Sequence, residues 1–180
     1  MQPPSLVVVA FKPFNGRPVN RALQLAQLAL KSGKLPPGTQ IVPCAVTRGA
    51  VDAVVRQALP ASKQVPVIWL GETDDAASRG ALLVETIAQN SLHGQPIDTS
   101  NPRGHRTVVL HGSVAAQLCP TCDVSRDAGD HLCNYAMCAM HANSGVKRWV
   151  FLHVPRQGDS SRQLEALSEV ATGMTGQRNK

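Results

Sequence analysis

The residue best suited to nucleophilic chemistry in this sequence is Cys133, which follows Asp130 in the stretch 128–134. If Asp130 caps a helix, Cys133 falls in the first turn of that helix. Free backbone N–H groups and the helix dipole stabilise a thiolate there, and the same N–H groups could bind an oxyanion. The alternative for Cys133 is a buried and unreactive thiol, which is the common state of a free cysteine.

A base and an orienting acid could complete such a site. His153 lies near the end of the apolar run 149–154, at a sheet edge where sites form, and the element that carries it follows the Cys133 helix. Glu85 lies within the apolar stretch 82–88, where a carboxylate needs a partner, and it could orient the imidazole. A core histidine and a glutamate on an exposed face remain open as alternatives. Together, the three residues would perform acyl transfer.

A second group of residues has the spacing of a zinc site. Cys119 and Cys122 form a C-x-x-C pair, and Cys138 and His141 follow with the spacing C-x-x-H. A helix that runs back along the preceding strand would bring the four residues together. A structural zinc, a disulfide or four unrelated residues with Cys138 in the core all stay open, and we expect a metal-free chain.

Composition excludes several classes of protein. The 180 residues are 43% hydrophobic and 17% charged, which is enough for the core of one globular domain. The net charge is +6, but the 18 Lys and Arg residues are dispersed and only 3% of residues are aromatic, so we expect no nucleic-acid binding. No apolar run reaches the ~20 residues of a membrane helix. We recognise no secretory signal, and the five cysteines are an odd number, so we expect a cytoplasmic location.

Apolar runs alternate with helical patterns, and these elements must position the reactive side chains. We expect helices after Asn20, over 50–59 after Thr47, over 130–142, and from a capping box formed by Ser160 and Gln163. We expect strands at 6–11, 41–42, 65–70, 82–87, 107–110, 123–125 and 149–154. This order predicts a mostly parallel, twisted sheet with helices on both faces. It forms one domain over 1–175, with a long surface loop at 90–106 and a frayed tail at 176–180.

Five segments of the chain carry motifs in a fixed order. Residues 9–16 with Asn20 resemble G-F-x-P-F-G-G…N-P, and residues 79–90, which include Arg79 and Glu85, fit G-R-x-x-x-x-x-E-R-x-A-x-N. The next three segments are similar to G-x-Q-P-x-D, S-x-x-A-G-x-F-x-C-N and F-I-H-x-P, and they lie at 94–98, 125–134 and 151–155. In this order, the motifs resemble those of the pyroglutamyl peptidases, also called pyrrolidone carboxyl peptidases.

This resemblance implies a cofactor-free cysteine peptidase with a three-layer α/β/α sandwich fold. Its substrate would be a peptide with an N-terminal pyroglutamyl residue, and family members are often homotetramers. By the resemblance, Cys133 is the nucleophile, His153 the general base and then acid, and Glu85 the orienting carboxylate. Five further residues are expected to line the substrate pocket: Phe11, Phe14, Glu72, His131 and Leu132.

The chain departs from the family pattern at the pocket. Glu72 stands where the family has a glutamine, His131 stands where it has a phenylalanine, and much of a ligand-bordering stretch is missing between Asn90 and Gly94. We therefore expect weakened or altered specificity, with a Glu72 carboxylate that needs a donor from the ligand. Two alternatives remain: a non-catalytic member of the fold that binds a small acidic or lactam ligand, and a zinc-stabilised basic module that contacts nucleic acid.

Overall fold

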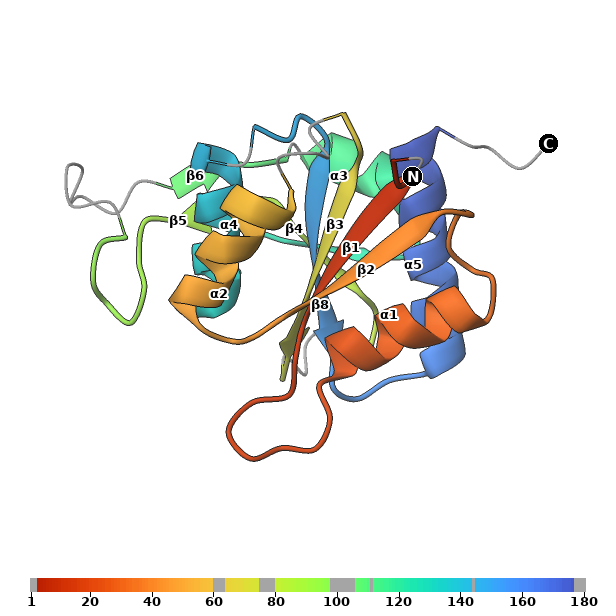
Figure 1. Cartoon of the computed structure of the whole chain (residues 1–180), viewed down its shortest axis with the longest axis horizontal. Helices are drawn as coiled ribbons and strands as arrows, with labels where there is room; N and C mark the ends of the chain where they lie inside the picture. Colours follow the sequence, from red (N-terminus) through yellow and green to blue (C-terminus); the bar gives the residue numbers. More distant parts are fainter. Residues whose placement is uncertain are drawn as a thin grey trace.

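The centre of the molecule is a six-stranded sheet in the order β2-β1-β3-β8-β4-β7 (Figure 1). The computed structural model describes residues 3–59, 64–74, 80–97, 106–110, 112–143 and 145–176. The strands of the main sheet are β1 (Leu6–Phe11), β2 (Thr39–Cys44), β3 (Val67–Thr73), β4 (Leu83–Glu85), β7 (Asp123–Ser125) and β8 (Trp149–Pro155). A second sheet pairs β5 (Ile87–Gln89) with β6 (Arg106–Val108).

The main sheet is parallel except where β4 runs antiparallel to β8. Its central strands are apolar on both faces, and all six residues of β1 are buried. Such continuous apolar runs are typical of parallel strands that are covered on both sides. The predicted single-domain α/β fold with a mostly parallel sheet is confirmed.

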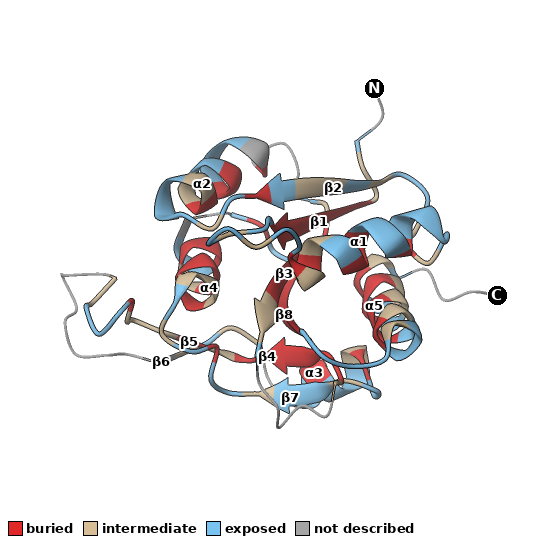
Figure 2. Cartoon of the chain, turned by 90° about the horizontal axis from the view of Figure 1, so that it is seen from below, coloured by how far each residue is buried: buried red, intermediate tan, exposed pale blue. Residues whose placement is uncertain are grey.

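Helices cover both faces of the sheet and form the outer layers, as Figures 1 and 2 show. One face packs against α1, α3 and α5 through a core that includes Leu25, Ala115 and Leu167. The other packs against α2, α4 and the wider helical turn η1 through Val51, Val55 and Met137. The bounds are α1 (Arg21–Lys31), α2 (Arg48–Ala53), η1 (Val54–Ala58), α3 (Gly112–Leu118), α4 (Leu132–Asn143) and α5 (Ser160–Thr175).

Helix starts follow the polar residues that precede them. Asn20 accepts a hydrogen bond from Ala22 N at 2.9 Å, and Thr47 accepts one from Ala50 N at 3.2 Å, so both predicted helix starts are confirmed. The predicted capping box at the last helix is wrong. Asp159 caps α5 by accepting from Ser161 N at 2.8 Å. Gln163 is fully buried and donates instead to Gly80 O at 3.0 Å.

The strand expected over 82–87 divides at Thr86 into β4 and β5, which belong to different sheets. Thr86 donates from both its backbone N and its Oγ1 to Ser125 O, which ends the main-sheet pairing at this point. Strand β3 runs three residues beyond its predicted end at 70 and therefore carries Glu72. The short helix α3 was not predicted, because its seven residues begin at a glycine and include two alanines but few large apolar residues.

Several predictions fall outside the described residues: Pro60 as the end of the 50–59 helix, most of the second half of the 90–106 loop, and the tail beyond Gly176. Gly176 itself ends α5 in the left-handed conformation, with φ of 72°. Among the helices of the described residues, none combines the length and the apolar character that crossing a membrane requires.

Candidate active site

A cavity of about 1070 Å³ opens beside the ends of β1, β3 and β8, the antiparallel strand β4 and the start of α4. This is the edge of the sheet where binding sites form in open α/β folds. The structure brings together at this cavity all the residues that the sequence singled out for catalysis and substrate binding: Phe11, Phe14, Glu72, Glu85, His131, Leu132, Cys133 and His153.

His153 and Glu85 form a buried pair in the wall of the cavity. His153 Nδ1 lies 2.7 Å from Glu85 Oε1, and the two residues are only 6% and 1% exposed. Their strands are antiparallel neighbours in which Glu85 lies opposite Phe151, so the two side chains meet diagonally on one face of the sheet. The second carboxylate oxygen, Oε2, has no hydrogen-bond partner among the described residues. A buried carboxylate in this position holds the imidazole in one orientation and favours its charged form.

Cys133 reaches this pair because β3 has a glycine at the point of contact. Gly71 lies opposite His153 in the β3–β8 register, and a Cβ atom on Gly71 would lie 2.7 Å from Cys133 Sγ. Cys133 is the second residue of α4, and its side chain interacts with that of His153. Because Nδ1 of His153 faces Glu85, Nε2 is the nitrogen that faces the thiol. Gly71 carries no reactive group, so sequence reasoning about side-chain chemistry missed it.

The imidazole of His153 favours its protonated state. Burial alone would lower its pKa, but the charge and hydrogen bond of Cys133 and the contact with Glu85 outweigh burial. Together they raise the pKa of His153 from 6.5 to about 10. The imidazole is therefore protonated at neutral pH and holds a positive charge beside the Cys133 sulfur.

The free cysteines Cys44 and Cys138 have a different environment. Burial raises the pKa of the Cys44 thiol to about 11, although nearby Lys12 opposes the shift. Burial likewise raises the pKa of Cys138 to about 11, and this thiol donates a hydrogen bond to Gln89 O at 3.1 Å. Both thiols are therefore protonated and poorly nucleophilic at neutral pH.

The start of α4 differs in one respect from the sequence prediction. Asp130 does not cap the helix, because its carboxylate accepts from Ser91 Oγ at 2.8 Å and Gly94 N at 2.5 Å. The Ser91 hydroxyl is the main cause that lowers the pKa of this partly exposed carboxyl. Helix α4 begins at Leu132, so Cys133 still lies in its first turn, where backbone N–H groups have no partner within the helix.

Asn134 fixes this helix start, a role that the sequence analysis did not assign. Its Nδ2 donates to Gln89 O and Ser91 O, both at 2.7 Å, and its Oδ1 accepts from Gln89 N at 2.7 Å. Asn134 is fully buried, and these three bonds tie the first turn of α4 to the end of β5 and to Ser91 beyond it. The pairing of this asparagine with the preceding cysteine in one motif was the available signal. Arg79, another motif residue, lies outside the described residues.

The expectation that the Glu72 carboxylate needs a donor from the ligand is wrong. Glu72 Oε1 accepts from Arg17 Nη2 at 2.5 Å, and Oε2 accepts from the backbone N of Arg21 at 2.5 Å. Both donors come from the segment that precedes and begins α1, which the spacing along the sequence did not place against β3. The carboxylate lines the cavity but is already paired by the protein.

His131, at the position of the expected aromatic wall, pairs with a second histidine. Its Nδ1 lies 3.2 Å from His93 Nδ1, and the two ring centroids are 5.0 Å apart. Both imidazoles line the cavity. One wall of the pocket is therefore polar, as the sequence comparison with the family motif predicts.

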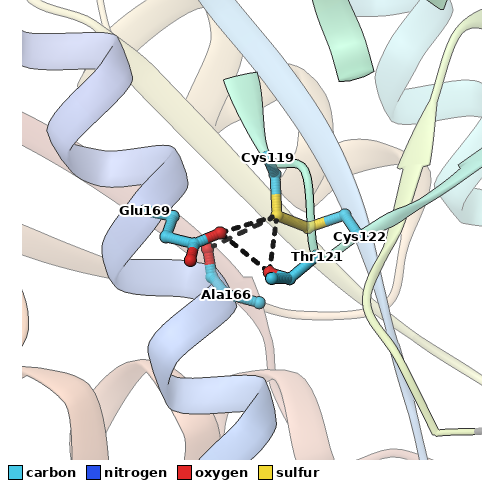
Figure 3. Close-up of a disulfide and its surroundings, with 5 residues drawn as sticks. All are labelled: Cys119, Thr121, Cys122, Ala166 and Glu169. Carbon is cyan, nitrogen blue, oxygen red and sulfur yellow. Dashed lines mark hydrogen bonds between the residues drawn. A yellow bond between two sulfur atoms is a disulfide. The ribbon is translucent and has the colours of Figure 1, made fainter. Parts of the chain in front are cut away.

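The four residues of the suggested zinc site do not come together. Cys119 and Cys122 form a disulfide at the end of α3, where Thr121 donates to Glu169 on α5 at 2.8 Å (Figure 3). Cys119 packs into the core on the α5 side of the sheet, whereas Cys138 packs into the core on the α4 side. The sheet separates them, because α4 crosses to the face opposite α3. Within the described part of the chain, no group of three His, Cys, Asp or Glu residues could hold a metal ion.

Comparisons with known proteins give matches at the level of structure. No family model matches the chain, and no curated protein matches it. Pyroglutamyl peptidase I from Bacillus amyloliquefaciens is similar with a TM-score of 0.74 at 18% identity, over 96% of this chain and 97% of that one. A mutant pyrrolidone carboxyl peptidase from the hyperthermophile Pyrococcus furiosus has a TM-score of 0.69 at 20% identity, over 95% and 98% of the two chains. The enzyme from Thermus thermophilus has a TM-score of 0.63 at 22% identity, over 94% and 99%. The chain thus has the fold that its motif resemblance predicts.

Proposed function

We propose that this chain is a cysteine peptidase that removes N-terminal pyroglutamyl residues from peptides. The observation that carries the proposal is the arrangement of Cys133, His153 and Glu85 at one cavity, where His153 pairs with Glu85 and interacts with Cys133. A nucleophile, a base in contact with it and a third group that orients the base are the components of covalent acyl transfer. The fold shared with pyroglutamyl peptidases and the motif resemblance support the same reaction.

In the first half of the reaction, the Cys133 thiolate attacks the carbonyl carbon that joins the pyroglutamyl residue to the peptide. Negative charge develops on the carbonyl oxygen, and the N–H groups of the first turn of α4 are suited to accept it. His153 then donates its Nε2 proton to the leaving amine, the C–N bond breaks, and a thioester to Cys133 remains.

In the second half, a water molecule attacks the thioester. His153, now neutral, accepts a proton from this water, and the C–S bond breaks to release pyroglutamate and the Cys133 thiolate. Glu85 holds Nδ1 of the imidazole throughout, so that Nε2 stays directed at the sulfur. This assigns Glu85 an orienting role rather than a proton-transfer step.

The aromatic side chains that line the pocket suit a ring-shaped acyl group. Phe11 and Phe14 line the cavity, and the Phe11 ring packs against Trp69 with centroids 5.8 Å apart, which fixes its orientation. A pyroglutamyl ring is neutral and mostly apolar, and it suits two aromatic walls. The polar His131–His93 wall supports the further proposal that specificity for plain pyroglutamyl amides is weakened.

Hydrolysis of a pyroglutamyl chromogenic amide, with and without a thiol-blocking reagent, tests the function. We expect release of the chromophore that the blocker abolishes. Binding of pyroglutamate without hydrolysis, and with an unreactive Cys133, would instead identify a non-catalytic member of this fold. If the protein neither hydrolyses the amide nor binds pyroglutamate, the proposal is overturned.

A further inference from the structure

Glu72 is a nearly buried carboxylate at the end of β3, one residue beyond the glycine that admits the nucleophile. Its side chain is only 5% exposed. Burying a carboxylate is unfavourable unless charged or hydrogen-bonding partners replace water. Two strong partners are present, Arg17 Nη2 and the backbone N of Arg21, each at 2.5 Å from one carboxylate oxygen.

Both partners belong to one short segment that leads into α1. Arg21 is the first residue of that helix, so its N–H is one that the helix itself leaves without a partner. A negative charge at a helix N-terminus also interacts favourably with the helix dipole. Glu72 therefore anchors the start of α1 from a neighbouring strand, while Asn20 caps the adjacent N–H of Ala22.

Arg17, which Glu72 holds in place, contacts Phe14 in turn. The Arg17 guanidinium lies over the Phe14 ring at 5.4 Å from its centroid, and Arg17 N donates to Phe14 O at 3.1 Å. Between them, Asn15 and Gly16 have φ of 53° and 71°, so the chain makes a tight left-handed turn. The position of the Phe14 ring thus depends on Arg17, and that of Arg17 depends on Glu72.

The ion pair also sets the charge of this wall. Glu72 forms an ion pair with Arg17 and a longer one with Arg156, whose Nε lies 3.5 Å from Oε1. Arg156 makes its closer contact with Asp74, at 2.7 Å, and is about half exposed. Glu72 lines the cavity, and its ion pair with Arg17 balances its negative charge there.

From these contacts we propose that Glu72 is a positioning residue that sets the Phe14 ring against the acyl group of the substrate. The proposal rests on the proposed function for the identity of the substrate. Glu72 acts through Arg17 and the start of α1 and makes no contact with the lactam ring. A carboxylate that faced the ring directly would have an open acceptor, whereas both oxygens of Glu72 are occupied.

The decisive variant is Glu72→Gln, assayed on a pyroglutamyl chromogenic amide. We expect KM to rise roughly tenfold, because an aromatic wall is displaced, while kcat changes by less than about twofold. The rate at which iodoacetamide alkylates Cys133 should stay unchanged, since the catalytic groups are not moved. A lower KM would mean that Glu72 faces the ring and overturns the proposal, and so would an unchanged KM.

A second variant keeps the proposal testable if Glu72→Gln folds poorly. Arg17→Met removes the guanidinium but leaves Glu72 and its bond to the α1 start, and it should raise KM to a similar extent. In the double variant the two effects should not add, because both changes break one contact. Additive effects would contradict the proposal. Glu165→Gln is the matched control: it breaks the exposed Lys34–Glu165 ion pair, 2.6 Å long, between other parts of the chain.

Wild-type protein that hydrolyses no pyroglutamyl amide would contradict the proposed function, not the positioning role. The role would then be measured by amide hydrogen exchange of residues 14–21. In Glu72→Gln, the amides of Arg17 and Arg21 should lose protection relative to wild type and to Glu165→Gln. Unchanged protection at both amides would overturn the positioning role.

Discussion

The sulfur of Cys133 occupies the space that a side chain on Gly71 would fill, since a Cβ there would lie 2.7 Å from Sγ and 2.9 Å from the Phe151 ring. Gly71 is also the β3 residue opposite His153. The helix that carries the thiol can approach the sheet at this point only because β3 has no side chain. The contact between nucleophile and base therefore depends on a residue without chemistry of its own.

Replacing Gly71 with alanine should displace the Cys133 thiol from His153. Misplacement of a reacting group by about 1 Å costs roughly 100-fold in rate. We expect kcat/KM for a pyroglutamyl amide to fall by about that factor. The matched control is Gly49→Ala, because nothing lies within 4 Å of a Cβ at Gly49. Equal activity of the Gly71→Ala and Gly49→Ala variants would show that the thiol does not need this space.

Substitution of the reactive groups should separate their roles. Cys133→Ala should abolish turnover, and His153→Ala should cost nearly as much, because the two groups act as a unit. Glu85→Gln should cost less, since orientation of the imidazole is only part of the catalysis. Steady-state kinetics on a pyroglutamyl amide measures all three.

The other free cysteines provide the controls for this series. Cys44→Ala and Cys138→Ala should retain turnover, because burial holds the pKa of both thiols near 11, and alkylation of wild type at neutral pH should modify Cys133 first. Wild-type activity in Cys133→Ala would show that the nucleophile is elsewhere. Wild-type turnover in His153→Ala would show that His153 is not the base for the thiol.

The sequence was sufficient to predict the layers of the fold and the clustering of the reactive residues at one site. Continuous apolar runs and the capping residues Asn20 and Thr47 are local signals, and the elements that they predict are present. The pairing of Glu72 with Arg17 and Arg21 could not be predicted in this way. It joins residues more than 50 positions apart, and nothing in the local pattern of either segment indicates the other.

Two further differences have the same physical origin. Gln163 has the spacing of a capping box, but tertiary burial gives its amide other acceptors, Gly80 O and Pro155 O. Cys119 and Cys138 have zinc-like spacing, but the chain places them on opposite faces of the sheet. Spacing along the chain specifies a site only when the intervening elements return to the same face.

The dependence of activity on pH should reflect the raised pKa of His153. Imidazolium is needed to protonate the leaving amine, so kcat/KM should fall in alkaline solution as pH passes about 10. Glu85→Gln removes one of the contributions that raise this pKa, so the alkaline limb should move to lower pH. A pH–rate profile of both proteins measures the shift, and an alkaline limb at the same pH in both would contradict the assignment.

The same shift predicts how stability changes with pH. His153 has a higher pKa in the folded chain than the 6.5 of a free side chain, so the folded state binds more protons between pH 6.5 and about 10. Its contribution to the free energy of unfolding is fully present below pH 6.5 and is lost as pH rises towards 10. Denaturant titrations of wild type and His153→Ala should therefore differ most in acid and converge in alkali.

The Cys119–Cys122 disulfide should stabilise the chain modestly. It closes a loop of only four residues, for which chain entropy gives about 2 kcal/mol, or a change in Tm of about 4–8 °C for a domain of this size. We expect a dithiol reductant to lower Tm by this amount in wild type and to have no effect in a Cys119→Ala/Cys122→Ala variant. If a metal chelator lowered Tm instead, the chain would hold a bound metal, which the Cys119–Cys122 disulfide does not predict.

The last prediction concerns the polar wall of the pocket, which His131 forms with His93. A pyroglutamyl ring is mostly apolar, so an imidazole wall that retains water binds it less well than a phenyl ring would. One hydrophobic contact of this kind is worth about 1–3 kcal/mol of transition-state binding.

His131→Phe should therefore raise kcat/KM on plain pyroglutamyl amides by at least about tenfold. Glu72→Gln should give no gain and should weaken any improvement when the two are combined, because the Glu72 carboxylate holds Arg17 rather than the ring. Steady-state kinetics on the two single variants and the double variant measures this. His93→Phe is the comparison variant, since it changes the same imidazole pair from outside the motif that carries Cys133. Wild-type kcat/KM of about 10⁵ M⁻¹s⁻¹ or more, in the ordinary range of enzymes, would show that His131 does not face the ring.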